Sequence, residues 1–143
     1  MQQFINPYLV IGAALSALAG LVHIGCIVFG APWYRFLGAG GVMIQMVETG
    51  HWYPPVFTAA IAATLFAFSA YALSAAGAIR RLPLLKLVLC TIASIYLLRG
   101  LCFFVLIPLF PENGILFWII SSAICLVLGL VHFVGVRQTW GRL

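Results

Sequence analysis

The segment from Tyr34 to Tyr53, YRFLGAGGVMIQMVETGHWY, separates two long apolar segments and holds most of the polar residues found away from the chain ends. It contains Glu48, one of the two acidic residues in the chain, together with Arg35, Gln45 and His51. The sequence on either side is almost wholly apolar. We therefore expect this segment to connect two helices that cross a membrane.

The composition of the whole chain points to the same class of protein. Of its 143 residues, 65% are hydrophobic and 6% are charged, whereas soluble domains carry about 25% charged residues. The mean hydropathy is +1.20. Four apolar segments each approach or exceed the ~20 residues that span a bilayer as a helix, and they lack the alternating pattern of a barrel. These segments cover residues 7–30, 54–78, 83–110 and 114–136.

We accordingly predict an all-α membrane protein that forms a single domain over residues 1–143. Its four transmembrane helices form a bundle, and a short interfacial or re-entrant helix lies between the first and second spans. Small residues recur at four-residue intervals in two spans, as Gly12, Ser16 and Gly20 and again as Ala59, Ala63 and Ala67. Such stripes allow close helix packing, so we expect both to lie inside a compact bundle. The alternative is that a stripe holds a homo-oligomer or a larger membrane complex together.

The distribution of basic residues predicts how the chain is oriented. Five of the seven Lys and Arg residues flank the second connection or follow the last span: Arg80, Arg81, Lys86, Arg137 and Arg142. The positive-inside rule then places both termini of this multi-pass protein in the cytoplasm. These cations suit anionic lipid headgroups, whereas a nucleic-acid partner is disfavoured because no basic stripe with interleaved aromatic residues is present.

Residues 42–49 are predicted to form about two helical turns between glycines. Gln45 and Glu48 are three residues apart and are therefore expected to share a face of that helix. Two alternatives remain open: an amphipathic helix on the outer membrane surface, or a re-entrant helix between the spans. The second is allowed only where protein or water satisfies the helix ends.

Arg99 is the most informative residue in any span, because a guanidinium stays protonated and must find acceptors or reach water. Tyr96 lies one turn before it on the same face. Arg99 and His23 each lie about sixteen residues, or ~24 Å, from the cytoplasmic end of their spans, so we expect them at a similar depth. An intramembrane histidine is either bonded to a backbone carbonyl or part of a cavity.

Only two carboxylates can neutralise Arg99. Glu112 lies in the short outer turn and is expected to be solvated, so Glu48 is predicted to be the partner of Arg99. The ion pair would either fix helix packing or belong to a ligand pocket, since buried ion pairs add little net stability. The predicted ligand-binding residues are Arg99, Glu48, His23, Tyr96 and Gln45.

No cofactor, metal or catalytic residue is predicted. A haem held by two histidines is disfavoured because His23 and His132 differ in depth by roughly 18 Å. Zinc is disfavoured because no CxxC or helical HxxxH pattern accompanies the histidines and cysteines. Nucleophile motifs, paired carboxylates and phosphate loops are absent, which disfavours an enzyme.

The four-span layout with a glycine-rich, polar outer connection resembles small bacterial inner-membrane proteins of the DoxX-like type. This resemblance covers architecture and matches no motif residue by residue. It implies a four-helix bundle in a bacterial inner membrane. The expected function is binding or transport of a small amphipathic or anionic molecule, such as a lipid headgroup or a quinone, in the outer half of the bundle. The alternatives are a structural subunit of a larger complex and a membrane-embedded isomerase or oxidoreductase.

Overall fold

The structure is a computed structural model that describes residues 5–143, and these residues form helices and connections without any strand. The predicted all-α fold is confirmed. In chain order the elements are α1 (Pro7–Phe29), α2 (Ala31–Phe36), α3 (Gly41–Glu48), α4 (Tyr53–Ala76), α5 (Leu85–Leu101), the 3-10 turns η1 (Phe103–Val105) and η2 (Ile107–Leu109), and α6 (Ile115–Thr139).

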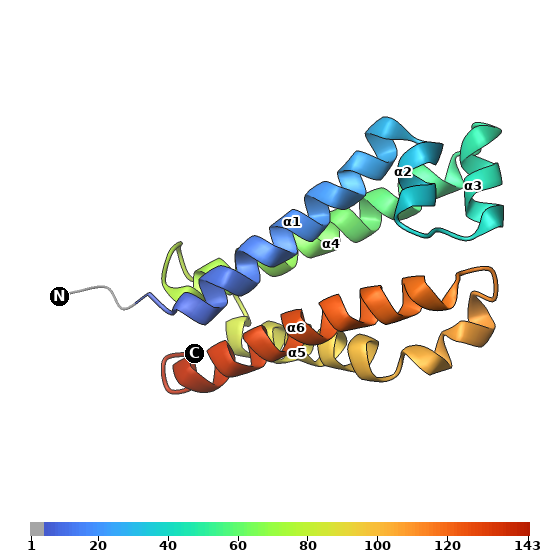
Figure 1. Cartoon of the computed structure of the whole chain (residues 1–143). Coiled ribbons are helices and arrows are strands. Elements are labelled where there is room, and N and C mark those ends of the chain that lie inside the picture. The colour runs from blue at the N-terminus through green and yellow to red at the C-terminus, as the bar shows by residue number, and fades with distance from the viewer. Residues whose placement is uncertain (1–4) are drawn as a thin grey trace.

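The long helices form two antiparallel pairs (Figure 1). Helix α1 packs along α4, α5 packs along α6, and the two pairs touch mainly through α1 and α6. Figure 1 shows the pairs close together at the end of the molecule that holds the C-terminus and diverging toward the end that holds α2 and α3. We call these the terminal end and the α2–α3 end.

Asn6 joins three helices at the terminal end. Its side-chain oxygen accepts a hydrogen bond from the backbone N–H of Leu9 at 3.0 Å and so caps α1. Its side-chain nitrogen donates to Gln138 of α6 at 2.8 Å, and its backbone N–H donates to the carbonyl of Ala76 in α4 at 3.1 Å. Because Asn6 is 1% exposed, these bonds are protected from water and hold the two pairs together here.

Glycine allows α5 and α6 to approach closely. A Cβ at Gly100 of α5 would lie 2.9 Å from the backbone nitrogen of Leu126, and one at Gly129 of α6 would lie 2.9 Å from that of Leu97. Both distances are too short for a methyl group, so these positions require glycine. Between this contact and the terminal end, the two helices share a hydrophobic cluster: Leu85, Leu89, Ile92, Tyr96, Leu128 and Val136.

The two predicted stripes of small residues have different roles. Gly12, Ser16 and Gly20 of α1 are buried, and a Cβ at Gly12 would lie 2.8 Å from the ring of His132, so this stripe packs inside the bundle as predicted. In contrast, Ala59, Ala63 and Ala67 are exposed on the outside of α4. Their interior placement was wrong, because Thr58, Ala62, Ser69 and Ala72 form the buried face of α4 instead.

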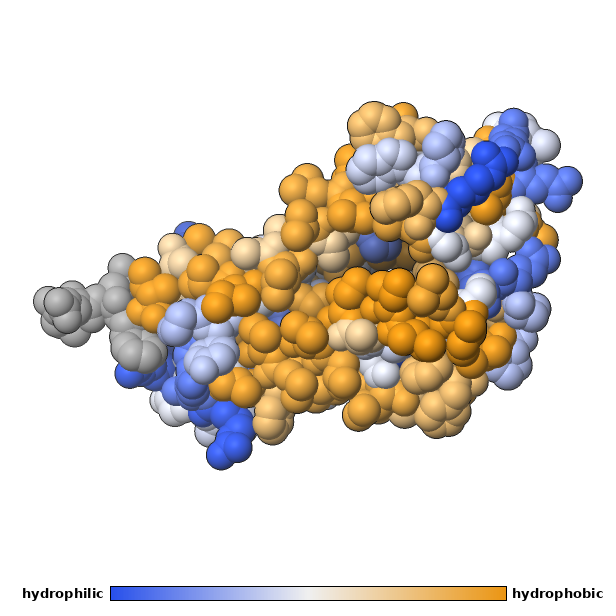
Figure 2. Space-filling model, viewed as in Figure 1, coloured by the Kyte–Doolittle hydropathy of each residue, from blue (hydrophilic) through white to orange (hydrophobic). Residues whose placement is uncertain are grey.

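The long helices have the dimensions and apolarity of membrane spans. Helices α1, α4 and α6 contain 23, 24 and 25 residues and are each apolar enough to cross a bilayer. Figure 2 shows an apolar surface around the middle of the molecule, with hydrophilic residues gathered at both ends. These features are those of a multi-pass membrane protein.

The third predicted span, residues 83–110, is not one straight helix. Helix α5 ends at Leu101, and the following turns, Phe103–Leu109, bend away by 70°. Pro108 lies in the second of these turns. It cannot donate a hydrogen bond and its ring would clash with the carbonyl of Phe104, so residues 104–108 could not continue as an α-helix. The two parts together can form a fourth span, and the break places Arg99 in the last turn of α5.

We predict that Gly100→Ala destabilises the bundle by about 1–3 kcal/mol, because the added methyl group forces α5 away from the backbone of α6. The midpoint of unfolding in a mixed detergent titration measures this change. Gly114→Ala is the matched control, since a Cβ at Gly114 meets no atom within 4 Å. Equal midpoints for the two variants would contradict the close α5–α6 contact.

Candidate functional site

Arg99 lies at the junction of α5 and α6 and is bound by hydroxyl groups. Its Nη1 donates to Ser122 Oγ at 3.1 Å and its Nη2 donates to Ser121 Oγ at 3.0 Å. The guanidinium carbon is 5.0 Å from the centre of the Trp118 ring, which is a cation–π distance. The side chain of Arg99 is half-buried. Three residues in the first two turns of α6 therefore hold this guanidinium.

The local fold explains why Arg99 reaches these partners. It belongs to the last turn of α5, where unpaired carbonyls give the helix end a partial negative charge that favours a cation. The close contact at neighbouring Gly100 brings α6 within reach of the guanidinium. The fork of N–H donors in Arg99 then spans two consecutive serines.

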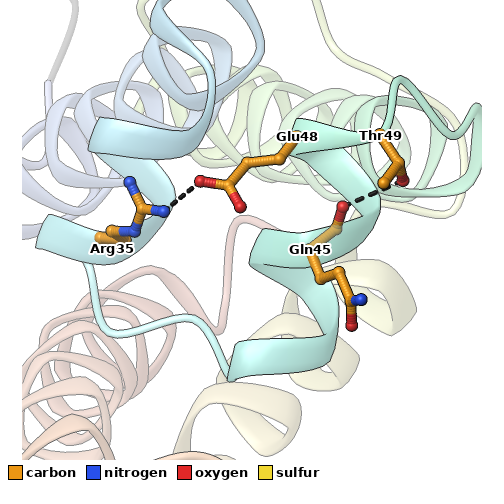
Figure 3. Close-up of polar contacts among 4 residues, drawn as sticks. All are labelled: Arg35, Gln45, Glu48 and Thr49. Carbon is orange, nitrogen blue, oxygen red and sulfur yellow. Dashed lines mark hydrogen bonds and ion pairs between the residues drawn. The ribbon is translucent and has the colours of Figure 1, made fainter.

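The predicted pairing of Glu48 with Arg99 is wrong. Glu48 Oε1 instead accepts a hydrogen bond from Nη2 of Arg35, so α2 and α3 are linked by an ion pair (Figure 3). The two side chains are 55% and 47% exposed. Arg35 is thirteen residues away in the chain and lies in the same connection, so it meets Glu48 without either side chain entering the bundle.

Gln45 is exposed, and its side chain points away from the Arg35–Glu48 pair (Figure 3). Its backbone carbonyl accepts a hydrogen bond from the hydroxyl of Thr49 at 3.0 Å. Helix α3 has no buried residue. Of the two predicted alternatives for this helix, the structure favours the exposed one over the re-entrant one.

Helix α2 is anchored to α4 by Tyr34. The phenol hydroxyl bonds with Thr58 Oγ1 at 2.7 Å and donates to the carbonyl of Pro54 at 3.3 Å. Burial raises the pKa of the Tyr34 phenol, so the hydroxyl keeps its proton and remains a donor. Tyr34 therefore fixes the polar connection on the α1–α4 pair.

Glu112 is exposed to solvent, as predicted, and it also contacts α3. Its Oε2 accepts a hydrogen bond of 2.7 Å from the backbone N–H of Val42, in the first turn of α3. A Cβ at Gly40 would lie 3.0 Å from Glu112 Cβ and 2.8 Å from Asn113 Oδ1, so glycine is needed for this approach. The carboxylate also complements the positive end of α3. Glu112 thus joins the two helix pairs at the α2–α3 end.

His23 and Tyr96 do not join Arg99 in one network. His23 Nδ1 lies 2.7 Å from the carbonyl of Ala19 in its own helix, and its side chain is half-buried. The Tyr96 hydroxyl is 2.9 Å from Ser16 Oγ, and its ring lies 5.3 Å from that of His132. Across residues 5–143, no hydrogen bond, ion pair or ring contact joins Arg99 to His23, Tyr96 or Glu48.

Sequence reasoning missed Ser121, Ser122 and Trp118 as partners of Arg99. The available signal was a pair of serines one turn after a tryptophan in the outer half of the fourth span. His132 was also not predicted as a site residue. It is fully buried, and its Nδ1 lies 2.8 Å from the Leu128 carbonyl. Its Nε2 has no hydrogen-bond partner within residues 5–143. Among residues 5–143, no three His, Cys, Asp or Glu side chains form a group able to hold a metal ion.

Comparison with models of known families, with curated proteins and with solved structures finds no match to this chain. The resemblance to DoxX-like proteins therefore rests on architecture alone and assigns no residue a role. A function for this chain has to be inferred from its own geometry and charge.

We predict that Glu112→Ala increases the hydrogen-exchange rate of the Val42 amide by roughly two- to fivefold, because the first turn of α3 loses its acceptor. Mass spectrometry of peptides that cover residues 40–48 measures the rate. Glu48→Gln is the matched control. It removes a negative charge from α3 itself and leaves the hydrogen bond from the Val42 amide to Glu112 intact. An unchanged rate in Glu112→Ala would show that this carboxylate does not cap α3.

Proposed function

We propose that the protein binds, or moves across the bilayer, a small amphipathic molecule whose headgroup is anionic or a strong hydrogen-bond acceptor, such as a lipid headgroup or a quinone. Arg99 is the binding group in this proposal. The observation that carries it is a guanidinium within the apolar part of the chain that has hydroxyl partners and, among residues 5–143, no carboxylate partner.

The charge of Arg99 supports a ligand of this kind. A charged side chain among membrane spans is costly and commonly marks a substrate or ion site. Ser121 and Ser122 satisfy two N–H donors but are neutral, so they leave the positive charge uncompensated. A headgroup with negative charge would supply the missing compensation and accept a charge-assisted hydrogen bond.

The arrangement of the helix pairs also supports an amphipathic ligand. Figure 2 shows a hollow between the pairs on the side toward the α2–α3 end, with apolar surface around it. Trp118 and Ser122 are buried in α6 beside the guanidinium. An apolar tail beside Arg99 would therefore meet hydrocarbon-like surface, while the headgroup meets the polar group.

The roles predicted for the other residues change accordingly. Glu48 and Gln45 have no part in this proposal, because they lie on exposed α3 and Glu48 is paired with Arg35. This proposal does not use His23 and Tyr96 either, since no contact links them to Arg99, and their role in ligand binding stays a prediction.

A second candidate function is supported by the exposed face of α4. Ala59, Ala63 and Ala67 form an outward stripe of small residues, which suits close packing with a helix of another subunit or of a second copy. In that case the protein is a structural or assembly subunit. The two functions differ in whether Arg99 is needed for ligand binding.

The charge distribution supports an orientation with both termini in the cytoplasm of a bacterial cell and the α2–α3 end on the outer side of the inner membrane. Five of the seven cations lie near the terminal end, and both carboxylates, Glu48 and Glu112, lie at the opposite end. Short basic connections are retained on the cytoplasmic side during insertion.

We predict that Arg99→Gln weakens binding of a brominated fatty acid by about tenfold or more, because a charge-assisted hydrogen bond is lost. Quenching of tryptophan fluorescence in the detergent-purified full chain measures binding, since Trp118 lies next to the guanidinium. Trp118→Phe is expected to remove the Arg99-dependent part of the quenching.

Arg35→Gln is the matched control, since it removes the same charge at an exposed position and should leave binding unchanged. An uncharged brominated alcohol of equal chain length should quench wild type and Arg99→Gln alike. Equal affinity of wild type and Arg99→Gln for the fatty acid would contradict the proposal. Co-purification of a stable partner with both proteins would then favour the structural subunit.

We further predict that a reporter fused after Leu143 lies in the cytoplasm, whereas one inserted at Gly50 lies on the outer side of the membrane. Paired phosphatase and fluorescent-protein fusions measure this. Replacing Arg80 and Arg81 by Gln should reduce the asymmetry, because these residues flank the second connection. Reporter activity on the outer side at both positions would contradict the orientation.

A further inference from the structure

The terminal end of the molecule carries a concentration of positive charge that the Arg99 site does not use. Arg80 and Arg81 lie in the α4–α5 connection and Lys86 in the first turn of α5, while Arg137 lies in the last turn of α6 and Arg142 follows that helix. Glu48 and Glu112, the two acidic residues of the chain, both lie at the α2–α3 end. The two acidic side chains therefore lie at the end of the molecule opposite these cations.

Part of this charge surrounds a depression in the surface. A hollow of about 490 Å³ lies between the end of α4, the α4–α5 connection and the end of α6. Its lining residues include Arg80, Arg81 and Arg142. Three guanidinium-bearing residues around one concave surface provide the planar, multiple N–H donors that phosphate groups prefer.

The lining of this hollow is held in place by specific contacts. Ser74 Oγ donates to the carbonyl of Arg80 at 3.1 Å and accepts from the backbone N–H of Leu82 at 2.9 Å, which fixes the connection onto α4. Arg81 donates to the backbone carbonyls of Arg142 and Leu143, which fixes the end of the chain beside the connection. The side chain of Arg80 makes no hydrogen bond or ion pair within residues 5–143 and is exposed.

A second, shallower depression continues from the first. It shares Arg81 and Leu143 with it and extends along Leu84, Lys86 and Leu87 at the start of α5. Leu84 is 72% exposed and Leu87 is 64% exposed, so this part of the surface is apolar and faces outward. Leu84 also has a left-handed backbone (φ 52°), which is unusual for a bulky residue and occurs where the surrounding structure imposes it.

An aromatic residue marks the height of the membrane interface beside these depressions. Trp140 is 51% exposed, and the Lys86 ammonium lies 3.8 Å from the centre of its ring. Exposed tryptophans of membrane proteins prefer the headgroup level. The cationic hollow and the apolar surface of α5 thus lie where a phospholipid headgroup meets its acyl chains.

We propose that the terminal end binds an anionic phospholipid. Its headgroup phosphate lies in the hollow formed by Arg80, Arg81 and Arg142, and its acyl chains lie along Leu84 and Leu87. The shared edge at Arg81 matches the join between headgroup and chains. Basic pockets between transmembrane helices are known to select anionic headgroups. This inference is independent of the Arg99 site, and Arg99→Gln is expected to leave it unchanged.

The test is native mass spectrometry of the full chain in a neutral detergent, with phosphatidylglycerol and phosphatidylcholine of identical acyl chains present at equal concentration. Wild type is expected to retain phosphatidylglycerol over phosphatidylcholine by roughly tenfold, as expected for two or more interfacial cations. The double variant Arg80→Gln, Arg81→Gln is expected to lose this preference.

The matched control is the double variant Arg35→Gln, Arg137→Gln, which removes the same net charge from positions outside both depressions. It should keep the preference, and an equal loss in both double variants would overturn the site in favour of general surface charge. Leu84→Gly should weaken lipid retention by removing apolar contact without straining the left-handed backbone. Displacement of the lipid by equimolar inorganic phosphate would overturn the lipid as the ligand.

Circular dichroism and gel filtration check that each variant is folded. If the double variant fails to fold, the single variant Arg80→Gln provides the test. The Arg80 side chain has no hydrogen-bond or ion-pair partner within residues 5–143, so its replacement breaks no such contact there. An unchanged preference in folded Arg80→Gln would then overturn the proposal, and at least a threefold loss would support it.

Discussion

The close contact between the backbones of α5 and α6 is the constraint on which the candidate site depends. At Gly100 and Gly129 the two helices are so near that even a methyl group would clash. Lipid tails are as apolar as the side chains, so helix association in a membrane relies on packing of this kind rather than on the hydrophobic effect. Because Arg99 directly precedes Gly100, the same contact that joins the helices brings its guanidinium to Ser121, Ser122 and Trp118.

Most basic side chains lie at the opposite end of the molecule from the two acidic ones, and within residues 5–143 Arg99 has no carboxylate partner. The two carboxylates are engaged at the α2–α3 end, Glu48 with Arg35 and Glu112 with the amide of Val42. The remaining cations other than Arg99 lie around the terminal end, where water and headgroups are accessible. Arg99 alone is placed among the spans with neutral partners. A half-buried charge among membrane spans is costly when it has no counter-ion.

The two ends of the bundle are held together by different means. At the terminal end, buried Asn6 bonds to α4 and α6, and the hydrophobic cluster of α5 and α6 begins nearby. At the α2–α3 end, an exposed hydrogen bond from the backbone N–H of Val42 to Glu112 links the pairs. An exposed bond exchanges with water and contributes little net stability. The α2–α3 end is therefore held together less firmly than the terminal end.

The sequence by itself determined the fold class, three of the four spans to within a few residues, and the sorting of charge to the two ends. Hydropathy and segment length suffice for this, because a membrane span must be a continuous apolar helix. Only the tertiary structure decided which polar groups meet. Glu48 had been assigned to Arg99 by counting carboxylates, whereas the fold places Arg35 nearer to it. Depth along a helix gives height but not direction around the axis, and the sequence did not show that α5 ends at Leu101, directly after Arg99 and Gly100. The partners of Arg99 lie on α6 because glycine contacts, which act between segments distant in the chain, set how α5 and α6 face each other.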